Sequence, residues 1–351
     1  MRYIKKIFSL FLVSSILLIS TACGKVDKSW ALKYDNNTVS NGVYVYFLWI
    51  AYNNALKIVS NGTEDIYDLE NQKVEGKDAA SWIKENAIKG AKDMLATEKL
   101  FEENGLTISE EENKKINEET EKSFENSKET FDKYGVTLED FKRAYATQNL
   151  KSEKLFNHLY NKGGTEAVSD EDLRNYYKTN YVNVSIISKS SETNPEEDGN
   201  TQQNDEEKKS AEQIEEQFKN YVNMINNNEK TFEEIGAMFK ESEKMEEDPI
   251  INETLDPKAG DILDEVSNKI KELEINKSTY VKLDDMFLLI YKKDINTILS
   301  NLDDEEERYK VLIEMKSDDF NNLLKNKAED LKIKVNESSI KDYNPTNFFK
   351  E

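Results

Sequence analysis

The segment YVNVSII (residues 181–187) marks the change of pattern that decides the fold. Valine and isoleucine alternate with other residues there, which is typical of a β-strand. Before this segment, apolar residues recur at spacings of three and four, the period of a helix with one buried face. With only four prolines and twelve glycines in 351 residues, long helices are favoured over a fold of many turns. The sequence therefore predicts a mostly helical α+β protein with a small sheet.

Helix start and stop signals divide the rest of the chain. Ser40, Ser109, Thr137 and Ser169 each precede a helical pattern, and Gly105 ends the predicted helix from about Ala79 to Asn104. After the strand we predict helices at 210–227, from 231 and after 260, and then strands at 278–283 and 286–291. This small unit reads β-α-α-α-β-β. From residue 298 the chain is helical again, and a short extended stretch follows at 332–335.

The first 22 residues have the organisation of an export signal. Three basic residues precede an apolar-to-small run at 7–22, which is too short for a comfortable membrane span. The sequence Ser20-Thr21-Ala22-Cys23 resembles a lipobox, although Ser20 stands where leucine is preferred. We therefore expect an exported protein anchored by a lipid on Cys23 to the outer face of the cell membrane, with a leader at 23–29. An uncleaved signal anchor, or an ordinary signal followed by a chance cysteine, are the alternatives.

Composition limits the other functions. The formal net charge of −22 disfavours nucleic acid as a partner, because like charges repel. Cys23 is the single cysteine, so no disulfide forms within the chain, and His158 is the single histidine. No metal site, cofactor or catalytic residue is predicted, because His158 has no second histidine or free cysteine to act with.

Four short motifs, in order, resemble a known family. They are the strand–turn–helix start at 34–49, GVTLEDF at 135–141, VSDEDLRNYY at 168–177 and TFEEI at 231–235. Together with the lipobox they resemble the extracytoplasmic foldase lipoproteins (PrsA-like) and, more loosely, the SurA chaperones. The resemblance implies a helical chaperone domain from residues 30–177 plus 298–335. It also implies an inserted parvulin-like domain at 178–297, with a disordered insertion at 190–209, and a polar tail at 336–351.

The same resemblance implies where an isomerase site would lie. Parvulins carry two histidines beneath a proline pocket, and here Ser185 and Leu288 take those places. The glycine-rich stretch expected within 244–256 is also absent. We therefore expect a domain without isomerase activity; if the chain is an enzyme, it is a peptidyl-prolyl cis-trans isomerase. Phe239, Met286 and Phe287 either line a remaining peptide groove or pack in the core.

The helix predicted at 41–59 is apolar almost all the way round. Its surplus rings, Tyr46, Trp49 and Tyr52, either belong to the core or face a groove for unfolded clients. The predicted function is a membrane-anchored foldase or chaperone whose partners are unfolded or nascent exported polypeptides. An active isomerase of the same family, and a solute-binding or surface-interaction lipoprotein, are the alternatives. A homodimer and the role of the acidic insertion at 190–209 are left open.

Overall fold

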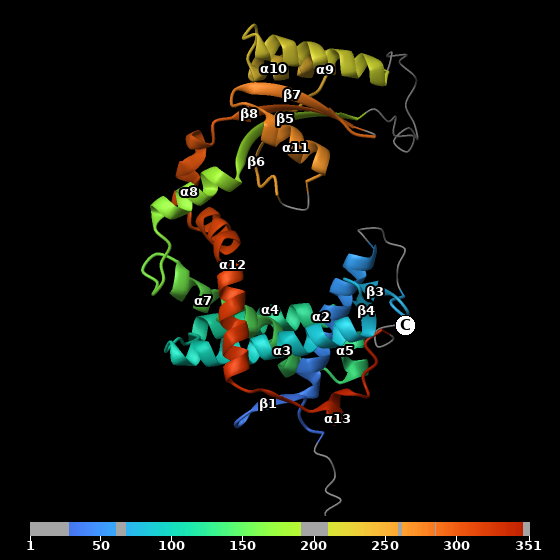
Figure 1. The fold of residues 1–351 in the computed structure, drawn as a ribbon, viewed down its shortest axis with the longest axis vertical. Coiled ribbons are helices and arrows are strands. Elements are labelled where there is room, and N and C mark those ends of the chain that lie inside the picture. The colour runs from blue at the N-terminus through green and yellow to red at the C-terminus, as the bar shows by residue number, and fades with distance from the viewer. Residues whose placement is uncertain (1–27, 61–67, 191–209, 259–261, 285, 347–351) are drawn as a thin grey trace, which may run out of the picture. The chain divides into compact units, whose positions relative to one another are not determined.

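The structure, a computed structural model, describes residues 28–60, 68–190, 210–258, 262–284 and 286–346. Contacts divide the chain into two compact units (Figure 1). Residues up to Glu166 and from Ser317 onward form the helical unit, and Ala167–Lys316 form the sheet unit. The predicted mostly helical α+β fold is confirmed. The predicted domain boundaries, 177/178 and 297/298, both fall inside the sheet unit, and the assignment of chaperone and parvulin-like domains stays a prediction.

The helical unit is built mainly of α-helices with two small sheets. Strand β9 from the C-terminal part of the chain pairs antiparallel with β1, with Leu32 opposite Val335, in a sheet ordered β2-β1-β9. The strands are β1 (Leu32–Tyr34), β2 (Asn37–Val39) and β9 (Lys334–Val335), and a hairpin of β3 (Lys73–Val74) and β4 (Lys77–Asp78). The helices are α2 (Asn41–Ser60), α3 (Ala79–Glu103), α4 (Glu110–Glu125), α5 (Lys128–Tyr134), α6 (Leu138–Lys142), the π-helical turn η1 (Arg143–Thr147), α7 (Gln148–Tyr160), α13 (Glu337–Ile340) and the later part of α12 (Glu305–Asp330).

Local sequence explains where these helices begin and end. Ser109 and Thr137 form capping boxes at the starts of α4 and α6, which satisfy backbone N–H groups that the helix leaves open. Gly135 ends α5 at a φ of 73°, a left-handed conformation that glycine adopts without strain. The helical pattern that begins after Ser109 is not one continuous helix, because α4 ends at Glu125 and α5 begins at Lys128. The Ser127 N–H turns back to the Phe124 carbonyl at 3.0 Å and separates α4 from α5.

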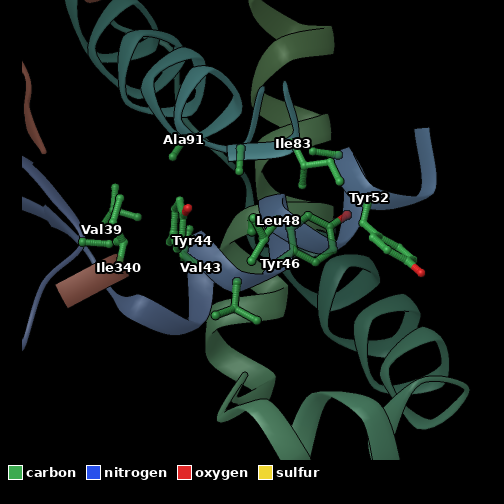
Figure 2. Packing of buried hydrophobic residues seen from close by; sticks show 14 of the residues in the cluster. Val39, Val43, Tyr44, Tyr46, Leu48, Tyr52, Ile83, Ala91 and Ile340 are labelled. Atoms are coloured by element: carbon green, nitrogen blue, oxygen red, sulfur yellow. The ribbon is translucent and has the colours of Figure 1, made fainter. Parts of the chain in front are cut away.

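The core of the helical unit lies between α2 and α3 (Figure 2). Tyr44 and Leu48 of α2 are buried with Ile83 and Ala91 of α3. Ile340 joins the same cluster at 1% exposure, although it lies in the segment predicted as a polar tail. Part of that segment therefore folds as α13 and contributes to the core.

The sheet unit contains one antiparallel sheet, ordered β6-β5-β8-β7. Helices α9 and α10 pack on one face of this sheet and α11 on the other (Figure 1). Its elements are α8 (Asp170–Asn180), β5 (Val182–Ser190), α9 (Ala211–Asn226), α10 (Phe232–Ser242), β6 (Ile251–Leu255), α11 (Asp264–Glu272), β7 (Lys277–Lys282), β8 (Met286–Lys293), the 3₁₀ turns η2 (Ile295–Asp303) and the start of α12.

The predicted order β-α-α-α-β-β lacks one strand. Strand β6 pairs with β5, with Ile186 opposite Ile251 and Val182 opposite Leu255, and lies at the edge of the sheet. Its sequence, INETL, is apolar only at its two ends, and Ile251 is 50% exposed. An edge strand that is half exposed to solvent gives almost no hydrophobic pattern, so the sequence did not predict β6.

Two expectations concern residues outside the described ranges. The signal at 1–22 with Cys23 lies there, and so do residues 191–209 of the predicted disordered insertion, whereas Ser190 is the last residue of β5. Among the helices that the structure describes, none combines the length and the apolar character that a membrane crossing requires.

Candidate functional site

The rings of α2 belong to an aromatic cluster in the helical unit. Tyr46 meets Phe141 of α6 edge-on at 5.5 Å between ring centroids, and Trp49 meets Phe131 of α5 edge-on at 5.5 Å. Tyr46 and Tyr52 are only 5% and 6% exposed, and burial raises the pKa of the Tyr46 hydroxyl. Of the two positions that the sequence allows, Tyr46 and Tyr52 therefore occupy the core rather than a groove (Figure 2). Trp49 is half-buried against the same core.

The aromatic cluster reaches the surface through Tyr145. Its ring lies 5.2 Å from that of Phe141, at 30° to it, and 36% of the residue is exposed. Tyr145 belongs to the π-helical turn η1, which interrupts the otherwise continuous helix from α6 to α7. Single π-turns within helices are frequent at functional sites. Tyr145 follows Phe141 by four residues, so regular helical spacing alone would put both on one apolar stripe, and a π-turn leaves no sequence signal of its own.

A hollow of about 270 Å³ lies beside Tyr145. Its apolar lining includes Ile116 of α4 and Leu150 of α7. Its charged lining is mainly acidic, with Glu112, Glu119 and Glu153 beside the one lysine Lys115. This hollow, with Tyr145, is called the tyrosine hollow below. An apolar floor with a charged rim suits weak contact with an apolar segment of an unfolded chain.

Glu112 is the best-fixed carboxylate of this rim. It accepts hydrogen bonds from Lys154 Nζ at 2.6 and 2.8 Å, and it closes the capping box of α4 by accepting the Ser109 N–H at 2.7 Å. The Lys154 ammonium and the Ser109 donors lower the pKa of the Glu112 carboxyl to about 2. Glu112 therefore stays ionised near neutral pH, where the Lys154 ammonium compensates its charge, and Glu119 and Glu153 are the other carboxylates of the rim.

Ser185 and Leu288, the positions predicted in place of the parvulin histidines, do not belong to one site. Ser185 lies on β5 directly opposite Tyr291 and donates to Asn252 Oδ1 at 2.7 Å. Its neighbour Ile187, two residues on and hence on the same face, packs against α9 and α10. Leu288 packs in the cluster of the opposite face, with α11. The pairing of these two positions is therefore wrong, because a shift of one residue in a strand moves the side chain to the other face.

The residue of β5 that shares the face of Leu288 is Ile186. Both positions on that face are therefore aliphatic, as the sheet's core requires. The single histidine, His158, lies on α7 in the helical unit. Among the described residues, no group of three or more His, Cys, Asp or Glu side chains is placed to hold a metal ion.

The apolar side chains predicted as an alternative peptide groove are mainly core residues. Phe239 and Phe287 are 1% and 0% exposed and surround Phe218, with ring centroids 6.0 and 6.2 Å from it. Met286, at the start of β8, is only half-buried. Phe239 and Phe287 therefore pack in the core and do not line an open groove.

Most of the exposed large apolar side chains belong to the sheet unit. Of the eight large hydrophobic residues that are exposed in the described ranges, Ile58 and Tyr145 belong to the helical unit. The other six lie in the sheet unit: Met238, Met245, Ile251, Leu263, Ile275 and Ile313. Ile251 begins β6, an edge strand whose free side offers backbone groups to a further strand.

Comparisons with known proteins find similar structures but no family. No protein-family model matches the chain, and no curated protein matches it. The foldase protein PrsA from Streptococcus pneumoniae is 12% identical over 89% of this chain and 97% of that chain, with a TM-score of 0.37. PrsA from Lactococcus lactis is 10% identical over 91% and 97%, with a TM-score of 0.34. PrsA from Bacillus subtilis is 16% identical over 82% and 99%, with a TM-score of 0.28. At these identities and TM-scores the likeness carries no argument about activity.

Proposed function

We propose that this chain is an extracytoplasmic foldase of the holding kind, which binds unfolded exported polypeptides weakly and at several points. The observation that carries the proposal is the tyrosine hollow. There Tyr145, whose ring contacts Phe141 of the aromatic core, lines a hollow together with Ile116 and Leu150, and the charged lining of this hollow is mainly acidic. A chain segment with apolar residues and basic flanks fits this chemistry. The order of sequence motifs that resembles the extracytoplasmic foldases supports the same function.

The sheet unit contributes a second set of contacts rather than a reaction. Its six exposed hydrophobic side chains and the free edge of β6 can each hold an extended segment weakly. Two weak contacts on one molecule raise the overall affinity, because the second binding event becomes intramolecular. An isomerase has to stabilise a twisted X–Pro bond whose barrier is about 18–20 kcal/mol. No imidazole is present anywhere in residues 167–316 to support a parvulin-type site.

The tyrosine hollow can be tested by suppression of aggregation. Residues 24–351 would be mixed with a chemically unfolded exported protein, and light scattering followed on dilution. We expect Tyr145→Ser to require several-fold more protein for half-suppression, since truncating an exposed aromatic anchor removes about 1–2 kcal/mol of binding. Ile58→Ser is the matched control, because Ile58 is the other exposed large hydrophobe of the helical unit and is 45% exposed. An equal loss in both variants would show that the hollow is not the binding site.

Membrane anchoring through Cys23 is a separate part of the proposal. It rests on the order of basic residues, apolar run and lipobox-like sequence at 1–23. We expect Cys23→Ala to release the protein from the membrane fraction or to leave an unprocessed precursor. Normal membrane retention and normal processing of this variant would contradict lipid anchoring, without bearing on client binding.

A further inference from the structure

The sheet unit contains a pocket of about 420 Å³ at the end of the sheet where β5 begins and β8 ends. Five lysines supply all the charged side chains of its lining: Lys178, Lys258, Lys271, Lys292 and Lys293. No Asp or Glu lines it, although the whole chain has 70 acidic and 48 basic residues. This lysine pocket therefore has a local charge opposite to that of the protein.

The fold brings these lysines together from four places in the sequence. Lys178 and Lys271 lie in the last turns of α8 and α11, where positive charge is favourable beside the free carbonyls. Lys258 follows β6, and Lys293 lies on β8 directly opposite Asn183 of β5. Helix capping accounts for single lysines at helix ends, but it does not require five of them to surround one pocket.

None of the five lysines makes an ion pair within the part of the chain that the structure describes. Their recorded partners are neutral oxygens. Lys258 donates to Asn180 Oδ1 at 2.9 Å, and Lys293 to Asn252 Oδ1 at 2.8 Å. Lys292 donates to the carbonyls of Ile270 and Leu273 at 3.0 and 2.8 Å. Since each ammonium has three donors, hydrogen-bonding capacity remains at the pocket.

Lys292 and Lys293 are partly buried, and no carboxylate that the structure describes contacts either ammonium group to compensate the cost of desolvation. Desolvation lowers the pKa of Lys292, and it also lowers the pKa of Lys293 although Glu233 acts in the opposite direction. Acids do occur nearby, since Tyr181 in the lining donates to Glu314 and also feels Asp256. Neither of these two carboxylates lines the pocket.

We propose that the lysine pocket binds a phosphate-bearing anion. Arginine can hold a carboxylate through two parallel donors, as where Arg143 donates to both oxygens of Glu98 at 3.0 and 2.8 Å, although lysines also pair with carboxylates here, as Lys154 does with Glu112. The lysine pocket has no arginine, and flexible point charges suit the tetrahedral, multiply charged phosphate group. Val182, Pro257 and Ile275 add apolar wall for the organic part of such a ligand. The phosphate could belong to a free polyphosphate or to an anionic lipid headgroup.

Binding of tripolyphosphate to residues 24–351, measured by titration calorimetry at low ionic strength, tests this inference. The pocket variant is Lys178→Gln/Lys258→Gln/Lys271→Gln, since all three side chains are exposed and the fold does not depend on them. The matched control is Lys269→Gln/Lys282→Gln/Lys310→Gln, three exposed lysines of the same unit outside the pocket. We expect binding to weaken about tenfold in the pocket variant and less than twofold in the control, with melting temperatures unchanged.

Two further probes identify the source and the chemistry of the ligand. Co-sedimentation with phosphatidylglycerol vesicles, against phosphatidylcholine vesicles, tests the lipid source with the same two variants. A pocket-dependent response to either tripolyphosphate or the anionic vesicles supports the inference and names the source. Equal losses in both lysine variants, no response to either probe, or tighter binding of a poly-glutamate peptide than of tripolyphosphate would overturn it. The aggregation assay on Tyr145 is independent of all these outcomes.

Discussion

The two units of this protein present hollows of opposite charge. In the helical unit, three carboxylates and one lysine line the hollow beside Tyr145, whereas five lysines and no acid line the pocket of the sheet unit. The cores differ as well: a large cluster rich in aromatic residues packs around α2 and α3 in the helical unit, and two clusters lie on opposite faces of the sheet in the other. The proposals made above assign different roles to the two units: client binding at an aromatic surface to the helical unit, and an anion site and an open strand edge to the sheet unit.

The largest expected effect is a loss of stability in one unit when a buried phenylalanine of its core is truncated. Phe131 is fully buried among Tyr46, Trp49, Phe124 and Phe141. We expect Phe131→Ala to lower the free energy of unfolding of the helical unit by about 3–5 kcal/mol, through lost burial and the cavity left behind. Hydrogen exchange, followed peptide by peptide, should show lost protection in α2 to α7 and not in β5 to β8.

The matched variant is Phe287→Ala, at 0% exposure in the sheet unit, and it should give the reverse pattern. Equal loss of protection in both units from either substitution would show that they unfold together. That result would contradict the claim that the two units have independent cores.

A smaller effect is expected at the turn that precedes the capping box of α6. Gly135 has a φ of 73°, and a Cβ added there would meet no atom within 4 Å. Gly135→Ala should therefore destabilise the helical unit by about 1 kcal/mol through backbone strain alone. Chemical denaturation monitored by the tryptophans measures it, since all three of them, Trp30, Trp49 and Trp82, lie in this unit. A loss of more than about 3 kcal/mol in the free energy of unfolding would mean that steric crowding, and not backbone strain, explains the requirement for glycine at 135.

The smallest effect concerns the rim of the tyrosine hollow and depends on pH. The folded protein lowers the pKa of Glu112 to about 2 from the ordinary value of 4.5. Its ionised form therefore stabilises the fold above pH 4.5, and this contribution disappears as the pH falls toward 2. We expect Glu112→Gln to be less stable than the wild type at pH 7 and equally stable near pH 2.

Lys154→Gln removes the largest cause of that pKa shift and should reduce the same pH dependence. Thermal melts of the wild type and both variants between pH 2 and 7 measure the difference. A Glu112→Gln variant whose deficit is the same at every pH would contradict the assigned ion pair.

The sequence predicts regular, capped elements well and special geometry poorly. Capping boxes predict the starts of three helices, because they depend only on local sequence. These are Ser109 before α4, Thr137 before α6 and Thr231 before α10. The π-helical turn that contains Tyr145 escapes prediction, because such a turn between α6 and α7 leaves no local sequence signal. The strand β6 escapes as well, because an edge strand with polar centre residues has no buried face to reveal it.

The candidate sites follow the same rule. Apolar periodicity predicts that α2 is buried, yet it cannot say which rings are core and which are surface, and the structure buries Tyr46 and Tyr52. The register of β5 against β8 decides that Ser185 and Leu288 lie on opposite faces, and a single sequence does not fix the register of two strands about a hundred residues apart. The lysine pocket combines residues from 178 to 293, so no local pattern could have predicted it.

The most direct test of the central claim, client holding without isomerisation, is a paired assay on residues 24–351. Isomerisation of a proline-containing peptide and aggregation of an unfolded exported protein would be followed with the same preparation. We expect suppressed aggregation that depends on Tyr145, and an isomerisation rate equal to that of the uncatalysed peptide. Isomerase turnover would contradict the claim, because it would require a site on the sheet unit that works without histidine.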